Sequence, residues 1–397
     1  MVTSQPTVTP VSRRWPAAAG LTILLALGLL IRVPGLTRSL WLDEFGTWWV
    51  VQETLAEVWR RSLQFQGQSP LYYSLAWLSR TWLGDSELAL RVPSLLIGLS
   101  CAGVLAWTAD RLAGRRAAWL ATAFALFLPF FVRAGSEARP YALALLAAAV
   151  ALAGFVGVQT GVRWARGLWM AGGAAVAWAH YVEYPLVLGV VVSYGLWPAL
   201  RRRYPLRQFA IDTGAQWALV ALTLPQMLAL FGRRQQLSWV PTFDYLAFLP
   251  PLLPLLPALL LPLAEVPRRD VVTAGPAGSS TADEDVQRDL ARTLCVALAT
   301  QIAVIELAAL AGINLLVARY FLVTLVPAVL LAATSLARLP VLLRTLGLGL
   351  AVVLSATPLI ATYRASGAFS GLGYDDWRQA VELAAVRSRG PVTPLVL

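Results

Sequence analysis

The sequence predicts an all-α fold, a polytopic transmembrane bundle of about eleven helices. The 397 residues are 58% hydrophobic and 13% charged, and this charged fraction is about half that of a soluble domain. The apolar residues recur in runs of roughly 18 to 22, the length that crosses a bilayer core of about 30 Å. Arginines collect in every second loop between these runs. Together these features indicate a multi-pass helical membrane protein.

Each expected span is an apolar run that begins and ends near polar or charged residues. The first run follows Arg13 and Arg14 and has no small-residue cleavage site. We therefore interpret it as a retained span and not as a signal peptide. The spans are expected at 16–33, 91–110, 116–132, 140–158, 168–180, 185–200, 209–231, 245–264, 293–313, 316–337 and 345–363.

The distribution of arginine predicts the orientation. All 32 basic residues are arginine and the formal net charge is +11. We attribute this charge to cytoplasmic loops that obey the positive-inside rule, and not to a nucleic-acid partner. With the N-terminus in the cytoplasm, each cytoplasmic turn is basic, whereas the opposite loops are mixed in charge. The cytoplasmic arginines are then Arg111, Arg115, Arg116, Arg163, Arg166, Arg201, Arg202, Arg203, Arg207, Arg268, Arg269, Arg288, Arg292, Arg338 and Arg344.

The first outer loop, residues 34–90, is expected to carry two interfacial helices. Residues 47–61 place Trp48, Leu55 and Trp59 on one face at helical spacing. Residues 69–83 are apolar but short and contain Arg80. Counting 69–83 as a span would invert every later loop and would move Arg111, Arg115 and Arg116 outside. We therefore expect 69–83 to lie along the outer surface.

The domain organisation follows from these assignments. Residues 1–364 are expected to form one transmembrane domain. Within it, 265–291 reads as a flexible cytoplasmic linker because its core is TAGPAGSSTADED. The proline-dense run 248–263 is expected to be a kinked helix buried among its neighbours. Residues 365–397 are expected to form a short extracytoplasmic C-terminal tail.

Two adjacent carboxylates, Asp43 and Glu44, stand just after the first span in the sequence WLDE. A carboxylate costs several kcal/mol in hydrocarbon, so the pair must face water or a polar cavity. An acidic pair at the outer mouth of an apolar protein indicates chemistry on a substrate that is held at the membrane. Asp43 is the expected catalytic base and Glu44 its neighbour in the site. The alternative is that Asp43 only caps the following helix.

The other outer polar residues fit the transfer of a sugar from a lipid-linked phosphate to an acceptor hydroxyl. The acceptor needs a carboxylate to take its proton, and the departing phosphate needs fixed positive charge, which arginine forks supply best. Glu137 and Arg139 could instead form an ion pair, and His180 could be a structural interfacial residue. The candidate substrate-binding residues are Arg91, Glu137, Arg139, Tyr141, His180, Tyr181, Arg319 and Tyr320.

No cofactor is expected. The only histidine, and two cysteines inside or beside apolar spans, give no metal-ligand spacing. A divalent metal is possible, but nothing in the sequence indicates one.

The order of several short motifs over residues 30–380 resembles the bacterial polyprenyl-phosphate-sugar glycosyltransferases of the C-type superfamily. This superfamily includes the protein O-mannosyltransferases and the lipid A aminoarabinose transferase. Ser69-Pro70 stands where the family usually has two prolines. The motifs are Arg32-x-x-Gly35, Trp41-Leu-Asp-Glu44, Ser69-Pro-Leu-Tyr-Tyr73, Leu90-Arg-Val-Pro-Ser94, Gly114-Arg-Arg116, Ser136-Glu-Ala-Arg-Pro-Tyr141, His180-Tyr181, Ala318-Arg-Tyr320 and Asp376-Trp-Arg378.

The resemblance implies a transfer that is independent of metal or weakly dependent on it, with inversion at the anomeric carbon. The donor would be a polyprenyl-phosphate sugar, and the acceptor an unknown glycan, lipid or protein. The acidic site of the first outer loop falls on Asp43, that of the second on Glu137 and Arg139, and the late phosphate-binding arginine on Arg319. The resemblance also implies the cytoplasmic (inner) membrane, with membrane lipids as neighbours.

Two other functions stay open at the sequence level. A transporter or flippase of lipid-linked sugars should carry ionisable residues near the middle of the membrane, often with internal repeats. The sequence shows no repeat, and its polar residues collect at the outer mouth. A non-catalytic scaffold of the cell envelope would leave the ordered carboxylates without a purpose.

Overall fold

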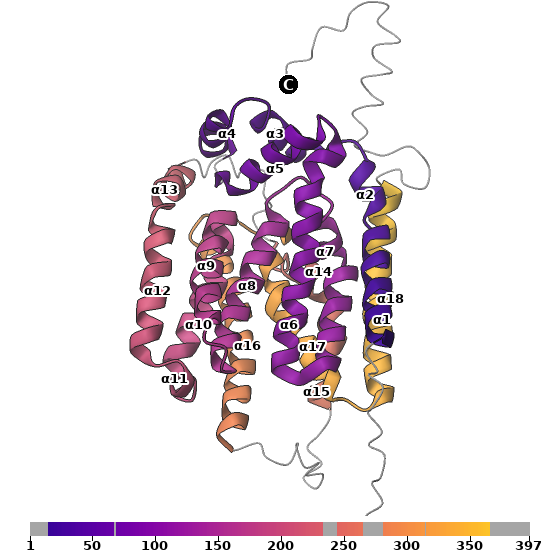
Figure 1. Cartoon of the computed structure of the whole chain (residues 1–397), viewed down its shortest axis with the longest axis vertical. Helices are drawn as coiled ribbons and strands as arrows, with labels where there is room; N and C mark the ends of the chain where they lie inside the picture. The colour runs from indigo at the N-terminus through magenta and orange to yellow at the C-terminus, as the bar shows by residue number, and fades with distance from the viewer. Residues whose placement is uncertain (1–14, 67–68, 233–243, 265–280, 314, 366–397) are drawn as a thin grey trace, which may run out of the picture.

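The computed structural model describes residues 15–66, 69–232, 244–264, 281–313 and 315–365, and within them the chain is helical without strands. The long helices run side by side, and a group of short helices covers one end of the bundle (Figure 1). Six segments are long and apolar enough to cross a membrane. The predicted all-α multi-pass architecture is therefore confirmed. The six are Ala19–Thr37, Glu87–Phe127, Tyr141–Gln159, Asp285–Leu310, Ala318–Arg338 and Val341–Ala361.

Each of the eleven predicted spans contains helix, but several are short or interrupted. The count of eleven stays a prediction. The helices within them are α1 (Trp15–Leu30), α6 (Glu87–Phe127), α7 (Pro129–Ala134), α8 (Tyr141–Gln159), α9 (Ala165–Ala179), α10 (Pro185–Leu196), α12 (Leu206–Ala221), α13 (Leu224–Gly232), α14 (Leu249–Leu252), α15 (Leu256–Ala264), α16 (Thr281–Leu310), α17 (Leu325–Arg338) and α18 (Val341–Ala365).

The 41-residue helix α6 is two antiparallel halves, because the backbone reverses at Ala113 and Gly114. Gly114 has φ +77°, in the left-handed region that glycine enters without steric cost. A straight helix of this length would span about 60 Å, twice the thickness of the bilayer core. The reversal therefore gives two of the predicted spans, 91–110 and 116–132, with Arg115 and Arg116 at their turn.

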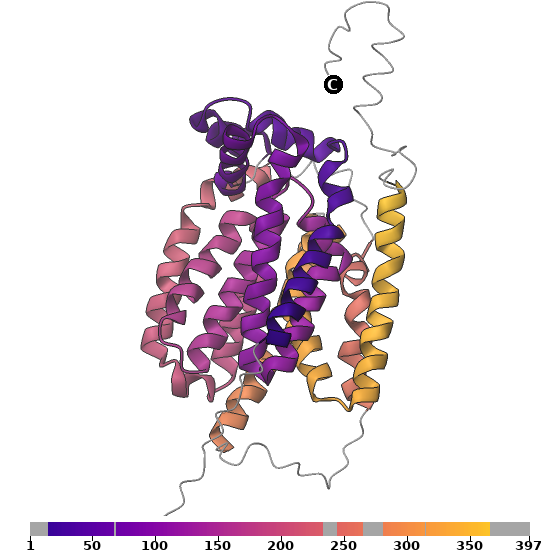
Figure 2. The same ribbon diagram turned by 45° about the vertical axis from the view of Figure 1, so that its right-hand side comes forward.

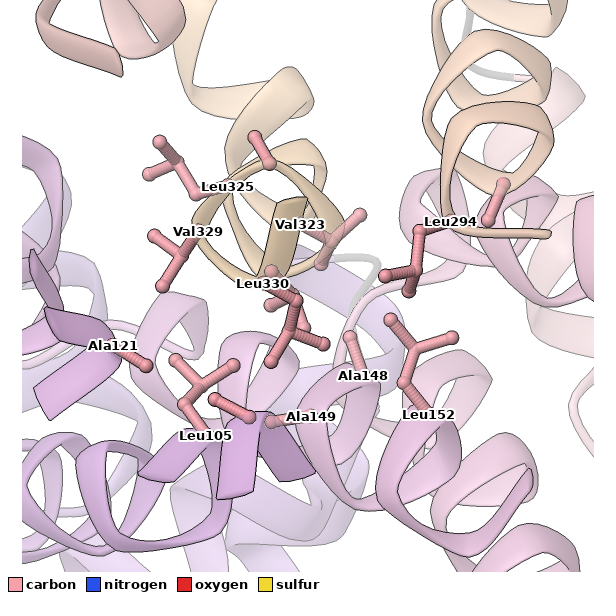
Figure 3. Close-up of a cluster of buried hydrophobic side chains, with 14 of the residues drawn as sticks. Leu105, Ala121, Ala148, Ala149, Leu152, Leu294, Val323, Leu325, Val329 and Leu330 are labelled. Carbon is pink, nitrogen blue, oxygen red and sulfur yellow. The ribbon is translucent and has the colours of Figure 1, made fainter. Parts of the chain in front are cut away.

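The core of the bundle is built from small residues that let helices approach closely. A Cβ atom on Gly154 of α8 would lie 2.1 Å from the backbone nitrogen of Trp169, and one on Gly172 of α9 would lie 2.5 Å from that of Ala151. Without a hydrophobic driving force between helices in lipid, such close packing is what holds them together. Figure 3 shows the continuation of this core, where Val329 and Leu330 of α17 meet α6 and α8.

The short helices at one end come from the first predicted outer loop. They are α2 (Val33–Thr37), α3 (Leu42–Val50), α4 (Leu55–Arg61) and α5 (Pro70–Leu83). Figure 2, turned by 45°, again shows them gathered across the ends of the long helices.

The segment 69–83 is helical, as expected, but the single helix predicted over 47–61 is wrong. The chain breaks at Thr54, whose side-chain oxygen accepts a hydrogen bond from the backbone N–H of Glu57 at 3.4 Å and so caps a second helix. Large apolar side chains remain exposed on these helices, as interfacial helices require. They are Leu42, Phe45, Trp48, Trp49, Leu55 and Trp59.

Two of the predicted domain features lie partly outside the described residues. Residues 281–291 of the expected linker 265–291 belong to α16, so helix begins earlier than the composition indicates. Residues 265–280 and the expected tail 366–397 lie outside the described part of the chain.

Candidate active site

Helix α3 aims its two acidic residues in different directions. Successive residues on a helix are about 100° apart, so only one of the pair can face the bundle. Glu44 points inward and is fully buried. The side chain of Asp43 keeps 26% of its surface exposed. Glu44 can therefore interact only within the protein, whereas Asp43 is accessible to a ligand.

Glu44 forms a buried ion pair with Arg91 of α6. The Nε and NH2 groups of Arg91 donate to the two carboxylate oxygens at 2.8 and 2.5 Å. The same carboxylate accepts the backbone N–H groups of Ala138 at 2.7 Å and Trp41 at 3.3 Å. The bond to Trp41 closes the first turn of α3. The sequence offers Asp43 as the cap of this helix, but the side chain that closes its first turn is that of Glu44.

Arg91 has no donor left for a substrate phosphate. A guanidinium has five N–H groups, and the remaining three donate to the carbonyl oxygens of Leu36, Arg38 and Ser39 at 3.1, 2.6 and 3.1 Å. Both Arg91 and Glu44 are completely buried. The geometry favours a positioning role for them over the catalytic and substrate-binding roles that the sequence suggested, because together they fix the path of residues 36–44.

Asp43 pairs with Arg319, which is 276 positions further along the chain. The Arg319 NH1 group donates to the Asp43 Oδ2 atom at 2.9 Å. Arg319 lies in the 3-10 helix η5 (Ala318–Thr324) and keeps 23% of its side chain exposed. The structure thus brings the predicted base and the predicted phosphate ligand into direct contact at an accessible surface.

Arg139 joins the same cluster from the loop before α8. Its NH1 group donates to the backbone carbonyl of Asp43 at 3.0 Å, and its guanidinium carbon lies 5.9 Å from the ring centre of Tyr141. The Thr47 hydroxyl donates to the carbonyl of Ala138 at 2.7 Å, which ties this loop to α3. Two arginines therefore approach Asp43 from opposite parts of the sequence.

Glu137 pairs with two arginines that are not among the predicted site residues. It is buried, and its Oε1 atom accepts hydrogen bonds from Arg133 at 2.6 Å and Arg38 at 3.3 Å. The alternative ion pair between Glu137 and Arg139 is thus replaced by pairs with two other arginines. We propose that Glu137 holds Arg38 and Arg133 at the outer surface, and that it does not touch the donor itself.

Three aromatic side chains form a wall beside the arginines. The ring of His180 lies 6.0 Å from that of Tyr141 and 5.6 Å from that of Tyr320, centre to centre. His180 follows the end of α9 and is the last residue of the predicted span 168–180. The guanidinium carbon of Arg319 lies 5.8 Å from the ring centre of Tyr320, so the aromatic wall borders both arginines of the cluster.

Two buried polar atoms, one in this wall and one next to it, have no hydrogen-bond partner among the described residues. They are the Nδ1 atom of His180 and the hydroxyl of the following residue, Tyr181. A buried polar group that lacks a partner costs free energy, and such groups often mark a ligand position. A hydroxyl-rich sugar would supply the missing partners.

Gln301 of α16 is a positioning residue that the sequence reasoning missed. The two N–H groups of its fully buried amide are shared among three acceptors, the carbonyl oxygens of Val182 and Tyr320 at 3.0 and 3.3 Å and Glu183 Oε2 at 3.1 Å. Its Oε1 atom accepts the N–H of Leu186 at 3.0 Å. It thereby fastens the His180 segment to the Arg319 segment. The signal was a lone amide in the middle of an apolar run, where polar residues are costly.

Replacing Gln301 by Leu should lower the transfer rate per folded molecule, beyond what the loss of folded protein explains. The buried groups that it serves lose their partners, at a cost of about 1–3 kcal/mol each when unsatisfied, and Arg319 shifts relative to His180. The measurement is the transfer rate per folded molecule beside the thermal midpoint. Gln159→Leu is the matched control, since this completely buried amide donates to the carbonyl oxygen of Leu200 at 2.9 Å, where the end of α8 meets α11 (Leu200–Arg203). Equal rate losses in both variants would contradict the positioning role.

Within the described residues, no group of three or more histidine, cysteine, aspartate or glutamate side chains could hold a metal ion. The contacts described above bring six of the predicted site residues into one cluster, with Tyr181 beside His180. The six are Asp43, Arg139, Tyr141, His180, Arg319 and Tyr320. Glu44 and Arg91 lie behind it, and Glu137 lies to one side.

Known proteins resemble this chain both in sequence and in fold. Residues 67–227 match the dolichyl-phosphate-mannose-protein mannosyltransferase family, a range that contains Arg139 and His180 but neither Asp43 nor Arg319. A search of curated proteins finds no match.

Two solved structures of ArnT from Cupriavidus metallidurans share the fold. The apo structure has a TM-score of 0.58 at 19% identity, and the structure bound to undecaprenyl phosphate has 0.54 at 20%. Each comparison covers 88% of this chain and 68% of the other. The resemblance predicted from the motifs is therefore confirmed in two respects: the chain shares the fold of ArnT, and its residues 67–227 match the dolichyl-phosphate-mannose-protein mannosyltransferase family.

Proposed function

We propose that this protein is an integral membrane glycosyltransferase that moves a sugar from a polyprenyl-phosphate donor to an acceptor on the outer face of the cytoplasmic membrane. The observation that carries the proposal is the accessible pair of Asp43 and Arg319, with Arg139 beside it. General-base chemistry needs the carboxylate, and a phosphate leaving group needs the arginines. The undecaprenyl phosphate bound by one ArnT structure supports a donor of this class.

In the proposed reaction, the acceptor oxygen forms a bond to the anomeric carbon while the bond from that carbon to the phosphate oxygen breaks. The proton of the acceptor hydroxyl passes to the Asp43 carboxylate. The electron pair of the broken bond stays on the polyprenyl phosphate, whose added charge Arg319 and Arg139 neutralise. Tyr141, His180, Tyr181 and Tyr320 surround the sugar.

The ion pair has a role before the donor arrives. In the empty enzyme, Arg319 and Asp43 neutralise each other's charge at 2.9 Å. A donor phosphate competes with Asp43 for Arg319. The Asp43 carboxylate then becomes free to accept a hydrogen bond from the acceptor hydroxyl when substrate is bound.

Replacing Arg319 by Lys is expected to weaken donor binding about tenfold or more. A lysine keeps the charge but cannot form the two-pronged contact of a guanidinium with phosphate, and charge-assisted hydrogen bonds are worth about 1.5–3 kcal/mol. The measurement is the affinity of the purified protein for a synthetic polyprenyl-phosphate sugar. Arg60→Lys is the control, because this exposed arginine on the same side pairs with Glu57 of its own helix and donates to Gln64. An unchanged affinity in the Arg319 variant would contradict the phosphate role.

Analysis of the products formed from the same synthetic lipid-linked sugar separates transfer from transport. A transferase releases free polyprenyl phosphate in proportion to the glycosylated acceptor, whereas a flippase moves the intact lipid. The ionisable cluster lies at the end of the bundle covered by α3 to α5 (Figure 1), and not on broken helices in mid-membrane, which favours transfer.

The orientation is proposed from the arginine-rich turns and is tested by labelling. With Cys295 replaced by Ser, a cysteine at Ser86 should react with an impermeant reagent added outside intact cells. A cysteine at the exposed Gln208, at the other end of the bundle, should react only after the cells are opened. The reverse pattern would place the candidate site in the cytoplasm.

A further inference from the structure

The end of the bundle opposite Asp43 contains a basic cavity that sugar transfer does not use. Its lining comes from α8, the α8–α9 turn, the start of α9, α11 (Leu200–Arg203) and the start of α12. Figure 1 shows α11 at the end of the bundle away from α3. Its volume is about 600 Å³. A second cavity of about 420 Å³ adjoins it, and Arg203 lines both. The larger cavity is lined by Val158, Gly161, Arg163, Arg166, Arg203, Pro205 and Gln208.

The larger cavity is positively charged. Three of the described residues that line it are arginines and none is acidic. Nearby Asp212 is already engaged, since Arg166 donates to both of its oxygens at 2.7 and 2.8 Å and the Tyr204 hydroxyl donates at 2.5 Å. This network holds Arg166 in place and balances the carboxylate. Arg163 and Arg203 add two further positive charges to the described lining, and Arg203 also donates to the carbonyl oxygen of Gln159 at 3.4 Å.

The cavity lies at the level of lipid headgroups. Trp164, next to Arg163 in the chain, is 65% exposed, and its ring lies 5.9 Å from that of Trp107. The guanidinium of Arg111 sits 5.2 Å from the Trp107 ring centre. Tryptophan and arginine collect where hydrocarbon meets the polar headgroups. Leu206, beside the cavity, also exposes its side chain, which gives an acyl chain an apolar surface to follow.

We propose that this cavity binds the phosphate headgroup of an anionic membrane phospholipid, with Arg203 and Arg163 as its ligands. A basic pocket between spans, flanked by exposed apolar residues at the interface, has the chemistry that recognises such lipids. The site lies at the opposite end from the transfer site, so the proposal stands independently of the proposed reaction.

Native mass spectrometry of the purified full chain in detergent tests the proposal. Phosphatidylglycerol should bind more tightly than phosphatidylcholine with the same acyl chains. Arg203→Gln should weaken phosphatidylglycerol binding by about ten- to a hundredfold, the loss expected for a charge-assisted contact, and Arg163→Gln should act in the same direction. Arg338→Gln, an exposed arginine at the same end outside the cavity, should leave binding unchanged.

Three results would overturn the proposal. The first is equal loss of lipid in the Arg203 and Arg338 variants, which would indicate diffuse charge attraction. The second is no preference for the anionic lipid. The third is displacement of the lipid by inorganic phosphate at equal concentration, which would indicate a site for the free anion. Circular dichroism of each variant confirms that the helices are intact.

Discussion

The Asp43→Asn variant should transfer sugar at least about a hundredfold more slowly than the wild type, because it loses the proposed general base. Asparagine keeps the shape of the side chain and can still accept a hydrogen bond from Arg319. The fold should survive, since Asp43 is partly exposed and the buried anchor of α3 is Glu44. The measurement is the single-turnover release of polyprenyl phosphate from a saturating lipid-linked sugar.

Donor affinity should be unchanged or higher in the same variant. Without the carboxylate, Arg319 no longer has to leave an ion pair to meet the phosphate. Asp85→Asn is the matched control, because this exposed aspartate on the same side pairs with Arg80 and lies outside the cluster. A rate near that of the wild type in Asp43→Asn would mean that Asp43 only neutralises Arg319 and that the base lies elsewhere.

The Glu44→Gln variant should lose stability, at about 3–5 kcal/mol, the usual cost of removing one partner from a buried ion pair. The amide has nearly the shape of the carboxylate, but it leaves the completely buried Arg91 without its counter-charge. The amide also keeps only one acceptor oxygen for the guanidinium and the two backbone N–H groups, of Trp41 and Ala138, that the carboxylate serves. The measurement is the thermal or denaturant midpoint of the purified protein in detergent.

Glu57→Gln is the control for this stability loss. Glu57 also accepts from an arginine, Arg60, but that pair is exposed, and solvent-exposed pairs contribute little. If the two variants melted at the same temperature, the ion pair of Glu44 would not hold the outer loop in place. If Glu44→Gln kept its stability but lost activity, Glu44 would belong to the catalytic group after all.

The architecture could be predicted from the sequence because lipid restricts the choice of structure. Backbone groups in hydrocarbon must be satisfied within the segment, so apolar runs of the right length become helices. The reversal inside α6 was also predicted, because the arginine-bearing stretch 111–116 separates the expected spans 91–110 and 116–132. The break at Thr54 did not, because the apolar residues on both sides keep helical spacing and a capping hydroxyl is too small a signal to decide.

The sequence could predict which residues form the candidate site but not the role of each. Asp43 and Glu44 are both carboxylates, yet helix geometry turns Asp43 toward an accessible surface and Glu44 toward Arg91. Arginines are equally ambiguous. Arg32 is completely buried and donates to the carbonyl oxygens of Gly28 and Leu126 at 2.7 and 2.9 Å, whereas Arg319 is accessible. Only the three-dimensional packing determines whether a guanidinium serves the backbone or a ligand.

The contact between Asp43 and Arg319 also bears on how a newly made chain would reach its proposed active form. The ribosome must add another 276 residues after Asp43 before its partner exists. Until then, the Asp43 carboxylate has no guanidinium from η5 to pair with. The first and last thirds of the polypeptide therefore supply the proposed site jointly, and we expect a chain that stalls before Arg319 to be inert toward lipid-linked sugar.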